Sequence, residues 1–163
     1  MRSTCDVFDD DPSRAHVCEL PLGQYGGVRA FAGRIATVRC FEDNVLFKQL
    51  ASEPGEGRVL VVDGGGSLRC ALAGDNVIGT AQASGWAGVV INGCVRDSAA
   101  LQQLPIGVRA LGTCPRPSGK AGEGRIDVVV RFGGIVFRPG AELYADDDGI
   151  VVLDLDDQIR AAT

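Results

Sequence analysis

The stretch RVLVVDGGGSLRCALAGDNVIGTAQASGWAGVVINGCVRD, residues 58–97, decides the fold of this chain. Residues 58–63 and 86–93 are nearly uninterrupted apolar runs, the pattern of strands that are buried on both faces. Between them, apolar side chains recur at helical spacing, which predicts one buried helix face made of Val77, Ile78, Ala81 and Gly85. A strand, a helix and a second buried strand predict a crossover unit with a partly parallel sheet.

Upstream of this unit, the sequence predicts short elements separated by turns. A helix is expected at residues 4–11 and another at residues 44–51, where Asp43 or Asn44 supplies the cap. Three strands are expected, at residues 16–20, 28–33 and 34–41.

Downstream, the clearest local pattern is RIDVVVRFGGIVFRPG at residues 125–140. Two alternating strands flank Gly133 and Gly134, which tolerate the positive φ angles of a tight hairpin turn. We therefore expect one β-rich α/β domain with mixed sheets over residues 1–163. The other expected elements are a strand at 67–74, a helix at 97–104, a strand at 106–115, a loop at 116–124, a turn at 146–148, a last strand and a terminal helix.

Composition excludes several classes of protein. The chain has 163 residues, 45% of them apolar, which suits one domain with an ordinary core, and its 23 scattered glycines indicate many turns. A formal charge of −5 argues against a direct nucleic-acid binder, which needs a basic surface. The apolar runs are too short to cross a bilayer, and the N-terminus lacks the apolar stretch of a secretory signal. We therefore expect no membrane partner and a cytoplasmic location.

The scarcity of histidine and lysine removes further chemistries. His16 is the single histidine, so a zinc enzyme with several histidine ligands is impossible, and no histidine-based nucleophile system is indicated. Schiff-base chemistry would need a buried lysine. Lys48 is predicted on the solvent side of a short helix and Lys120 in a loop rich in proline, serine and glycine, so neither is a good candidate for it.

Three other features have structural interpretations. The cysteines form no C-x-x-C pair and are expected to be reduced and structural; they stand at positions 5, 18, 40, 70, 94 and 114. Gly64–Gly66 follows a strand without an immediate helix, which favours a turn, with close approach of another backbone as the alternative. Asp146–Asp148 precedes a glycine between two short strands, which favours a turn over a calcium loop.

Residues 74–97 hold the sharpest candidate site. Gly74 precedes a helix whose first backbone N–H groups, from Asp75 to Ile78, would be unpaired and would favour an anion. Arg96 and Asp97 follow a buried strand, and the carboxyl ends of such strands lie on the same side as the helix starts. We therefore expect both groups to reach one ligand.

Each residue type in this set has a chemical role. Arg96 offers a bidentate contact for a carboxylate or an enolate oxygen. Asp97 suits Mg²⁺ or Mn²⁺, and Asp75 can orient a water molecule for proton transfer. The alternative is structural, with Asp97 capping a helix and Arg96 lying on the surface.

The segments VLVVDGGGSLRCALAGD, GWAGVVINGCVRD and GIVFRPGAELYADDDGIVVL resemble the RraA-like family. The family contains regulators of ribonuclease activity and metal-dependent 4-hydroxy-4-methyl-2-oxoglutarate/4-carboxy-4-hydroxy-2-oxoadipate aldolases, and the likeness runs from about residue 18 to residue 153. It implies a compact β/β/α sandwich-like domain of the swivelling-domain type. It also implies a ring-shaped homotrimer with sites near the subunit interfaces.

The aldolase members carry the motif D-x20-R-D-x2-E/D, which Asp75, Arg96 and Asp97 match here. The resemblance implies that Arg96 binds the pyruvyl carboxylate and enolate oxygen, and that Asp97 holds the metal partly through water. It also implies that Asp75 positions the protonating water and that the backbone of residues 74–77, Gly74, Asp75, Asn76 and Val77, holds the substrate. Two departures are Ala100, where the motif expects an acid, and the end of the sequence without the C-terminal extension of longer aldolases.

The resemblance thus implies a divalent-metal lyase that cleaves 4-hydroxy-4-methyl-2-oxoglutarate to pyruvate and decarboxylates oxaloacetate through the same pyruvate enolate. The ribonuclease regulator of enteric bacteria lacks the metal-ligand aspartate, which this chain keeps as Asp97. The alternative is a non-catalytic regulator that binds an RNase E-type endoribonuclease.

Methyl transfer in menaquinone synthesis is not favoured, because no adenosylmethionine-type glycine loop is present. A phosphohistidine carrier is excluded because His16 lies outside any fitting motif.

Overall fold

The structure is a computed structural model that describes residues 1–156. The helices of that part of the chain are α1 (Thr4–Asp10), α2 (Val45–Ser52), α3 (Asp75–Ala83) and α4 (Ser98–Leu101). Its strands are β1 (Ala15–Val17), β2 (Gly23–Gln24), β3 (Phe31–Arg39), β4 (Val59–Asp63), β5 (Ala71–Ala73), β6 (Gly88–Val95), β7 (Gly107–Thr113), β8 (Arg125–Ile126), β9 (Val130–Phe132), β10 (Ile135–Phe137), β11 (Glu142–Asp146) and β12 (Gly149–Leu153).

The main sheet is mixed, as the sequence predicts, with the order β1-β12-β11-β3-β4-β6-β7-β2. Strands β3, β4, β6 and β7 are parallel neighbours, and α3 lies in the connection between β4 and β6. The predicted crossover unit is therefore confirmed. Strand β3 joins two parts of the sheet, because its first half pairs with β11 and its second half pairs with β4.

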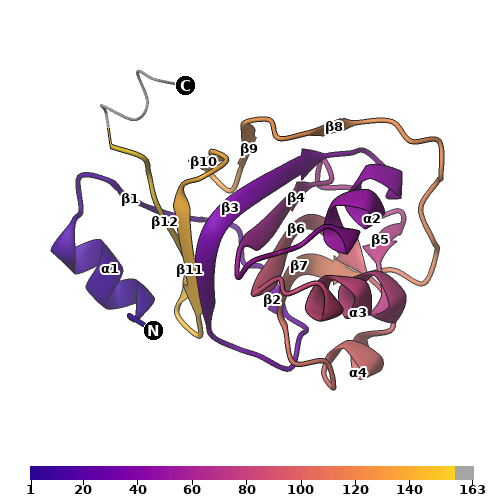
Figure 1. Ribbon diagram of the computed structural model, residues 1–163, viewed down its shortest axis with the longest axis horizontal. Coiled ribbons are helices and arrows are strands. Elements are labelled where there is room, and N and C mark those ends of the chain that lie inside the picture. The colour runs from indigo at the N-terminus through magenta and orange to yellow at the C-terminus, as the bar shows by residue number, and fades with distance from the viewer. Residues whose placement is uncertain (157–163) are drawn as a thin grey trace.

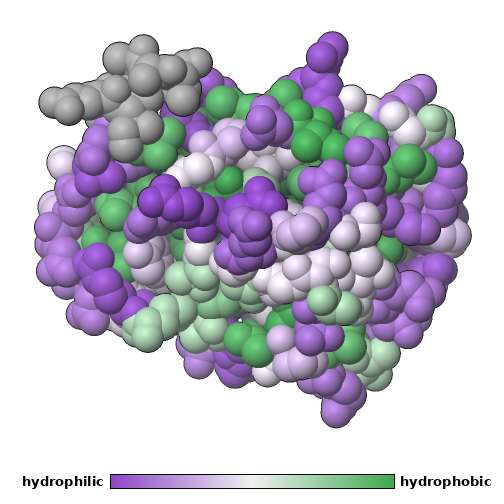
Figure 2. Space-filling model, in the orientation of Figure 1, coloured by the Kyte–Doolittle hydropathy of each residue, from purple (hydrophilic) through white to green (hydrophobic). Residues whose placement is uncertain are grey.

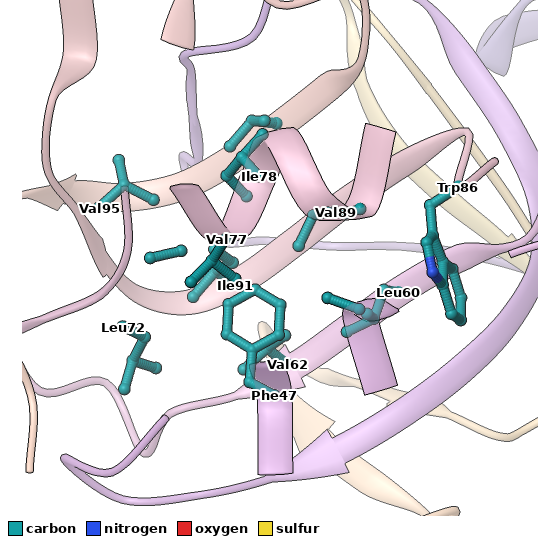
Figure 3. Packing of buried hydrophobic residues seen from close by; sticks show 14 of the residues in the cluster. Phe47, Leu60, Val62, Leu72, Val77, Ile78, Trp86, Val89, Ile91 and Val95 are labelled. Carbon is teal, nitrogen blue, oxygen red and sulfur yellow. The ribbon is translucent and has the colours of Figure 1, made fainter. Parts of the chain in front are cut away.

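Helices α2, α3 and α4 cover one face of the parallel strands, and α1 packs at the far edge beside β11 and β12 (Figure 1). Under the helices, Phe47 of α2 and Val77 of α3 point toward Val62 and Ile91 of the sheet (Figure 3). This packing explains the helical spacing of apolar residues in α3. Burying a side chain such as that of Phe47 contributes about 2 kcal/mol of stability.

A second core fills the opposite face of the same strands. Val59, Val61 and Val90 pack there with the β9–β10 hairpin, where the rings of Phe132 and Phe137 stack with centroids 4.3 Å apart. Because both faces are covered, β4 and β6 are apolar at successive positions rather than at alternate ones. The result is a helix layer over a sheet that is backed by further strands.

The structure confirms the hairpin turn and corrects some boundaries. Gly133 and Gly134 have φ angles of 61° and 76° and form the two-residue turn between β9 and β10. The expected strands at 28–33 and 34–41 are one strand, β3. The expected strand at 125–132 is two, β8 and β9, because Asp127 turns the chain with a φ of 61°.

Gly85 was expected on the buried face of α3, but it is exposed and has a φ of 87°, so it ends the helix instead of packing under it.

The turn at Asp146–Asp148 is confirmed as the connection between β11 and β12. The predicted terminal helix falls on residues 157–163, outside the described residues. None of the helices in residues 1–156 is long and apolar enough to cross a membrane.

The cysteines are unpaired, as expected, and four of them are buried. Burial, aided by the nearby carboxylates of Asp43 and Asp63, raises the pKa of Cys40 to about 12. A thiol with such a pKa stays protonated and unreactive near neutral pH. The four buried cysteines, whose thiol pKa values are all raised mainly by burial, therefore act as small apolar residues.

Candidate functional site

A pocket of about 170 Å³ lies at the carboxyl ends of β5 and β6, beside the loop that follows β7. It brings together all the candidate residues of the sequence analysis. The residues that line it are Asn44, Lys48, Ala71, Leu72, Ala73, Gly74, Asp75, Asn76, Val77, Arg96, Asp97, Pro117, Ser118 and Lys120. The expected approach of the α3 start to the end of β6 is therefore confirmed.

The first wall of the pocket is the start of α3. Gly74 is its N-cap residue and offers no side-chain cap, so the pocket is lined by backbone. Within the described residues, no hydrogen bond is seen for the N–H groups of Asp75, Asn76 and Val77. The N–H of Ile78 is different, because it donates to the Gly74 carbonyl at 3.1 Å, so the expectation of a fourth unpaired amide was wrong. The start of α3 therefore contributes three N–H groups and the positive end of the helix dipole to this wall of the pocket.

The second wall is Asp97, which has a strained backbone. Its φ and ψ are 56° and 41°, a left-handed conformation that is uncommon outside glycine. It occupies the N-cap position of α4, but its carboxylate makes no capping hydrogen bond. The alternative of Asp97 as a helix cap is therefore not supported. Such strain is typically kept where the side chain has a function.

Gly74 makes room for the Asp97 carboxylate. A Cβ atom at position 74 would collide with Oδ2 of Asp97 and would lie 3.2 Å from Cγ of Arg96. The φ of Gly74 is −133°, which any residue adopts, so its need for glycine comes from this close approach. The start of α3 and the end of β6 are thus fitted to each other at this point.

Arg96 is held by its backbone and leaves its side chain largely open. Its N–H donates to the Ala73 carbonyl at 2.9 Å, which joins it to the end of β5. Within residues 1–156, its guanidinium makes one long contact of 3.5 Å to the Pro115 carbonyl and lies 4.0 Å from the Asp97 carboxylate. The side chains of Arg96 and Asp97 are 44% and 46% exposed, so both have capacity for a ligand.

The third wall was missed by sequence reasoning, which set both lysines aside. Asn44 is buried at the start of α2; its amide donates to the Leu72 carbonyl at 2.9 Å and accepts from Nζ of Lys120 at 2.7 Å. Lys48, one helical turn after Asn44, lines the same pocket. The two lysines of the chain therefore stand in one site, and their scarcity was the signal that a sequence analysis had available.

Asp43 fixes the loop that carries Lys120. One carboxylate oxygen accepts from the Val45 N–H at 3.0 Å, and the other accepts from Ala121 and Gly122 at 2.6 and 2.9 Å. Burial raises the pKa of Asp43, but these backbone hydrogen bonds outweigh it and keep the pKa below its ordinary value. A charged Asp43 thus anchors this side of the pocket.

The donor set fits a hard divalent cation better than a zinc-type centre. No group of three or more His, Cys, Asp or Glu side chains in residues 1–156 is arranged to hold a metal. Asp97 and Asp75 nevertheless supply carboxylates to the pocket, and Mg²⁺ is commonly bound through one or two carboxylates, waters and substrate oxygens. Gly74, which has no side chain, leaves room for the Asp97 carboxylate beside it in this pocket.

In this mixed α/β fold, one pocket is thus lined by an arginine, two lysines, two aspartates and the start of a helix with three unpaired N–H groups in the described residues. The chain belongs to the RraA-like family, whose model, described as Aldolase/RraA, matches residues 4–152. This family includes aldolases and inhibitors of RNA processing.

Solved structures support the assignment. The chain is similar to a protein of Geobacillus kaustophilus HTA426 described as S-adenosylmethionine:2-dimethylmenaquinone methyltransferase, with 51% identity, a TM-score of 0.93 and coverage of 97% of this chain and 98% of that one. It is also similar to the RNA-processing inhibitor RraA of Thermus thermophilus, with 44% identity, a TM-score of 0.91 and coverage of 94% and 93%. An RNase ES inhibitor family member of Streptomyces coelicolor shares 26% identity, with a TM-score of 0.75 and coverage of 93% and 78%.

Proposed function

We propose that this protein is a divalent-metal-dependent lyase that releases pyruvate from 4-hydroxy-4-methyl-2-oxoglutarate, with oxaloacetate decarboxylation as a second activity. The observation that carries the proposal is the meeting of Asp75, Arg96 and Asp97 with the open start of α3 around one small pocket. Both reactions pass through a pyruvate enolate, and stabilising that charge is the main task of the site.

The cationic groups would bind and stabilise the substrate. The N–H groups of residues 75–77 and the guanidinium of Arg96 would hold the carboxylate of a 2-oxo acid. As the C–C bond breaks, Arg96 would also donate to the developing enolate oxygen. Because its side chain makes only one long hydrogen bond in the described structure, Arg96 is available for both contacts.

The two carboxylates would have separate roles. Asp97 would hold Mg²⁺ or Mn²⁺, which supplies Lewis acidity toward the substrate oxygens when bound. Asp75, at the start of α3, would orient a water molecule that delivers a proton to the enolate carbon. Ala100, which replaces the acid of the family motif, is exposed on α4 and does not line the pocket, so this site relies on Asp97 and Asp75.

The test is pyruvate release from both substrates by the purified protein, with Mg²⁺ and with a chelator. The proposal predicts turnover that chelation abolishes and that Asp97→Ala lowers by at least 100-fold, a loss of about 3 kcal/mol of transition-state stabilisation. Turnover that is indifferent to the chelator, or full activity in Asp97→Ala, would overturn it. The ring-shaped homotrimer implied by the resemblance and the cytoplasmic location expected from the composition belong to this proposal. Sedimentation tests the first and cell fractionation tests the second.

A second candidate function is regulation of an RNase E-type endoribonuclease, supported by the similarity to the Thermus inhibitor. A specific observation favours it, namely the exposed carboxylates of Asp6, Asp9, Asp147 and Asp148 on α1 and the adjoining β11–β12 turn. Three chains of charge −5 give a trimer of about −15, which suits an arginine-rich partner. Salt-sensitive capture of such a segment, unaffected by Arg96→Ala and weakened by Asp148→Asn, would support this role.

The methyltransferase activity in the description of the Geobacillus protein is not favoured for this chain. The N–H groups of Gly64 and Gly66 both donate to the Asn92 carbonyl at 3.1 Å, and that of Gly65 donates to Asp63 at 3.0 Å. These amides are therefore used within the protein. The glycine run is a turn that also approaches the β6 backbone closely, so both interpretations of it hold.

A further inference from the structure

A groove between α2 and α3 continues the pocket away from Arg96. Its volume is about 520 Å³, and it shares Lys48, Asn76 and Val77 with the pocket. The residues that line it are Val45, Lys48, Gln49, Ser52, Asn76, Val77 and Thr80. The pocket and the groove therefore adjoin at these three residues, and a longer ligand held at the start of α3 would extend past Lys48 into the groove.

The groove has a single charge. Among its lining residues only Lys48 is ionic, and the others are apolar or neutral polar side chains. Lys48 is exposed and makes no side-chain hydrogen bond or ion pair within residues 1–156. A lone cation at the junction of two cavities, with no carboxylate in the groove to neutralise it, favours an anionic group there.

Lys120 provides the contrast. Its ammonium is bonded to Asn44, its loop is anchored by Asp43, and it lines the pocket but not the groove. The two lysines therefore face different parts of a bound molecule. Lys120 lies beside the part held at Arg96, and Lys48 lies where the rest of the molecule would extend.

We propose that Lys48 and the α2–α3 groove form a subsite for the distal carboxylate of the substrate, so that Lys48 selects 2-oxo diacids over 2-oxo monoacids. This inference rests on the proposed function, because the pyruvyl end must occupy the Arg96 pocket for the distal end to reach Lys48. Hydrophilic and hydrophobic residues are mixed over the side of the molecule where α2, α3 and α4 lie (Figure 2). The groove walls are likewise mixed, with Val45 and Val77 beside the neutral polar side chains of Gln49, Ser52 and Thr80, so Lys48 is the group there that an anion would contact.

The experiment measures binding rather than turnover, with two unreactive acids of equal chain length. 2-Oxoglutarate and 2-oxopentanoate differ only in the distal carboxylate, and each is titrated calorimetrically into the protein with Mg²⁺ present. The wild type is expected to bind the diacid at least five-fold more tightly. Lys48→Gln is expected to remove this preference, and Lys48→Arg to restore most of it.

Two further variants separate the subsite from general effects of charge. Lys120→Gln is expected to weaken both acids by similar factors, because Lys120 does not line the groove. Arg131→Gln removes an exposed positive charge from the β9–β10 hairpin and is expected to change neither affinity. If Lys48→Gln instead weakened both acids equally, or changed the sedimentation coefficient without changing the preference, the subsite would be overturned.

The same titrations distinguish failure of the subsite from failure of the proposed function. Equal binding of the two acids by the wild type, with both lost in Arg96→Ala, would refute the subsite and leave the Arg96 pocket intact. Binding of neither acid by the wild type would refute both proposals.

Discussion

Two regions of the molecule combine arginine with aspartate, and they use these residues in opposite ways. At the β11–β12 turn, the Asp146 carboxylate accepts from the N–H and the hydroxyl of Thr4 at 2.8 and 2.7 Å. The guanidinium of Arg109, which is only 7% exposed, donates to the carbonyls of Asp146 and Arg29 at 2.6 and 3.1 Å. Here the charged groups hold α1 and the turn on the sheet.

At the pocket, the same residue types keep most of their binding capacity. In the described part of the chain, the guanidinium of Arg96 has one hydrogen bond of 3.5 Å, and the Asp97 carboxylate makes no capping bond although its backbone is strained. The buried Arg109 is tied to two backbone carbonyls through Nη2, although its Nε makes no hydrogen bond within residues 1–156. Charged groups tied to the chain in this way hold the fold together, whereas groups left open at a strained position are candidates for binding and catalysis. The difference predicts separate effects of mutation in the two regions.

The largest expected effect is that of Arg96→Ala on catalysis. Loss of the guanidinium removes the group that would hold the enolate charge, so kcat/KM for pyruvate release should fall by about 1,000-fold, or about 4 kcal/mol. The free energy of unfolding should change by less than about 0.5 kcal/mol, because the side chain is 44% exposed and weakly bonded. Steady-state kinetics and urea unfolding of the same preparation measure both quantities.

Arg109→Ala is the matched change in the other region. It removes two hydrogen bonds from a buried guanidinium, so the free energy of unfolding should fall by about 2 kcal/mol. Activity per folded molecule should stay within two-fold of the wild type. If Arg96→Ala and Arg109→Ala lowered both kcat/KM and the free energy of unfolding to the same extent, the contrast between the regions would be wrong.

A smaller effect is expected from two glycine substitutions in and beside α3. Gly74→Ala places a methyl group against the Asp97 carboxylate, so metal-dependent activity should fall by about 10-fold or more while the fold persists. Gly79→Ala meets no atom within 4 Å and should stabilise the helix by about 0.5–1 kcal/mol with activity kept. Thermal unfolding and the pyruvate assay compare the pair. Equal activity in both variants would show that the fit of Gly74 to Asp97 has no role.

The smallest expected effect concerns acid stability at the turn. Burial raises the pKa of Asp146, but hydrogen bonds from Thr4 and Asp148 and the nearby Arg109 outweigh it and lower the pKa. A lowered pKa in the folded state means that the charged form stabilises the fold above the unfolded-state pKa of about 4, and that this contribution is lost as the pH falls through the folded-state value.

Asp146→Asn should therefore lower the free energy of unfolding by about 1 kcal/mol at pH 7 and by less at pH 3. Denaturant unfolding across this pH range measures the difference. Asp9→Asn, at an exposed position of α1, is the control and should change the free energy of unfolding at pH 7 by less than about 0.5 kcal/mol. If Asp146→Asn lowered the free energy of unfolding by the same amount at pH 3 and at pH 7, the stabilising role of its charged form would be contradicted.

Much of the fold was predictable because the strongest local patterns agree with the packing. The apolar runs of β4 and β6 required burial on both faces, and Gly133 and Gly134 required a tight turn, and both features are present. Boundaries were less predictable where partners far apart in the chain decide them. Strand β3 is continuous because β11 and β4 share its length, which no local pattern reveals.

The candidate site was predictable only in the part that one crossover unit builds. Gly74, Asp75, Arg96 and Asp97 lie on consecutive strand ends, so their sequence spacing was enough to bring them together. Lys120 reaches the pocket through long-range bonds of its loop to Asp43 and Asn44, and sequence spacing carries no information about such bonds.

The proposed role of Asp97, whose carboxylate is open and whose backbone is strained, is to hold a divalent cation. The most direct measurement is an electron paramagnetic resonance titration of Mn²⁺ into the wild type, Asp97→Asn and Asp127→Asn. Asparagine tolerates left-handed backbone, and Asp127 has a φ of 61° close to the 56° of Asp97, so the two variants remove one charge at comparable positions. We expect one Mn²⁺ to bind per chain in the wild type and in Asp127→Asn, and Asp97→Asn to bind it at least 10-fold more weakly. Equal affinity in all three proteins would contradict this role.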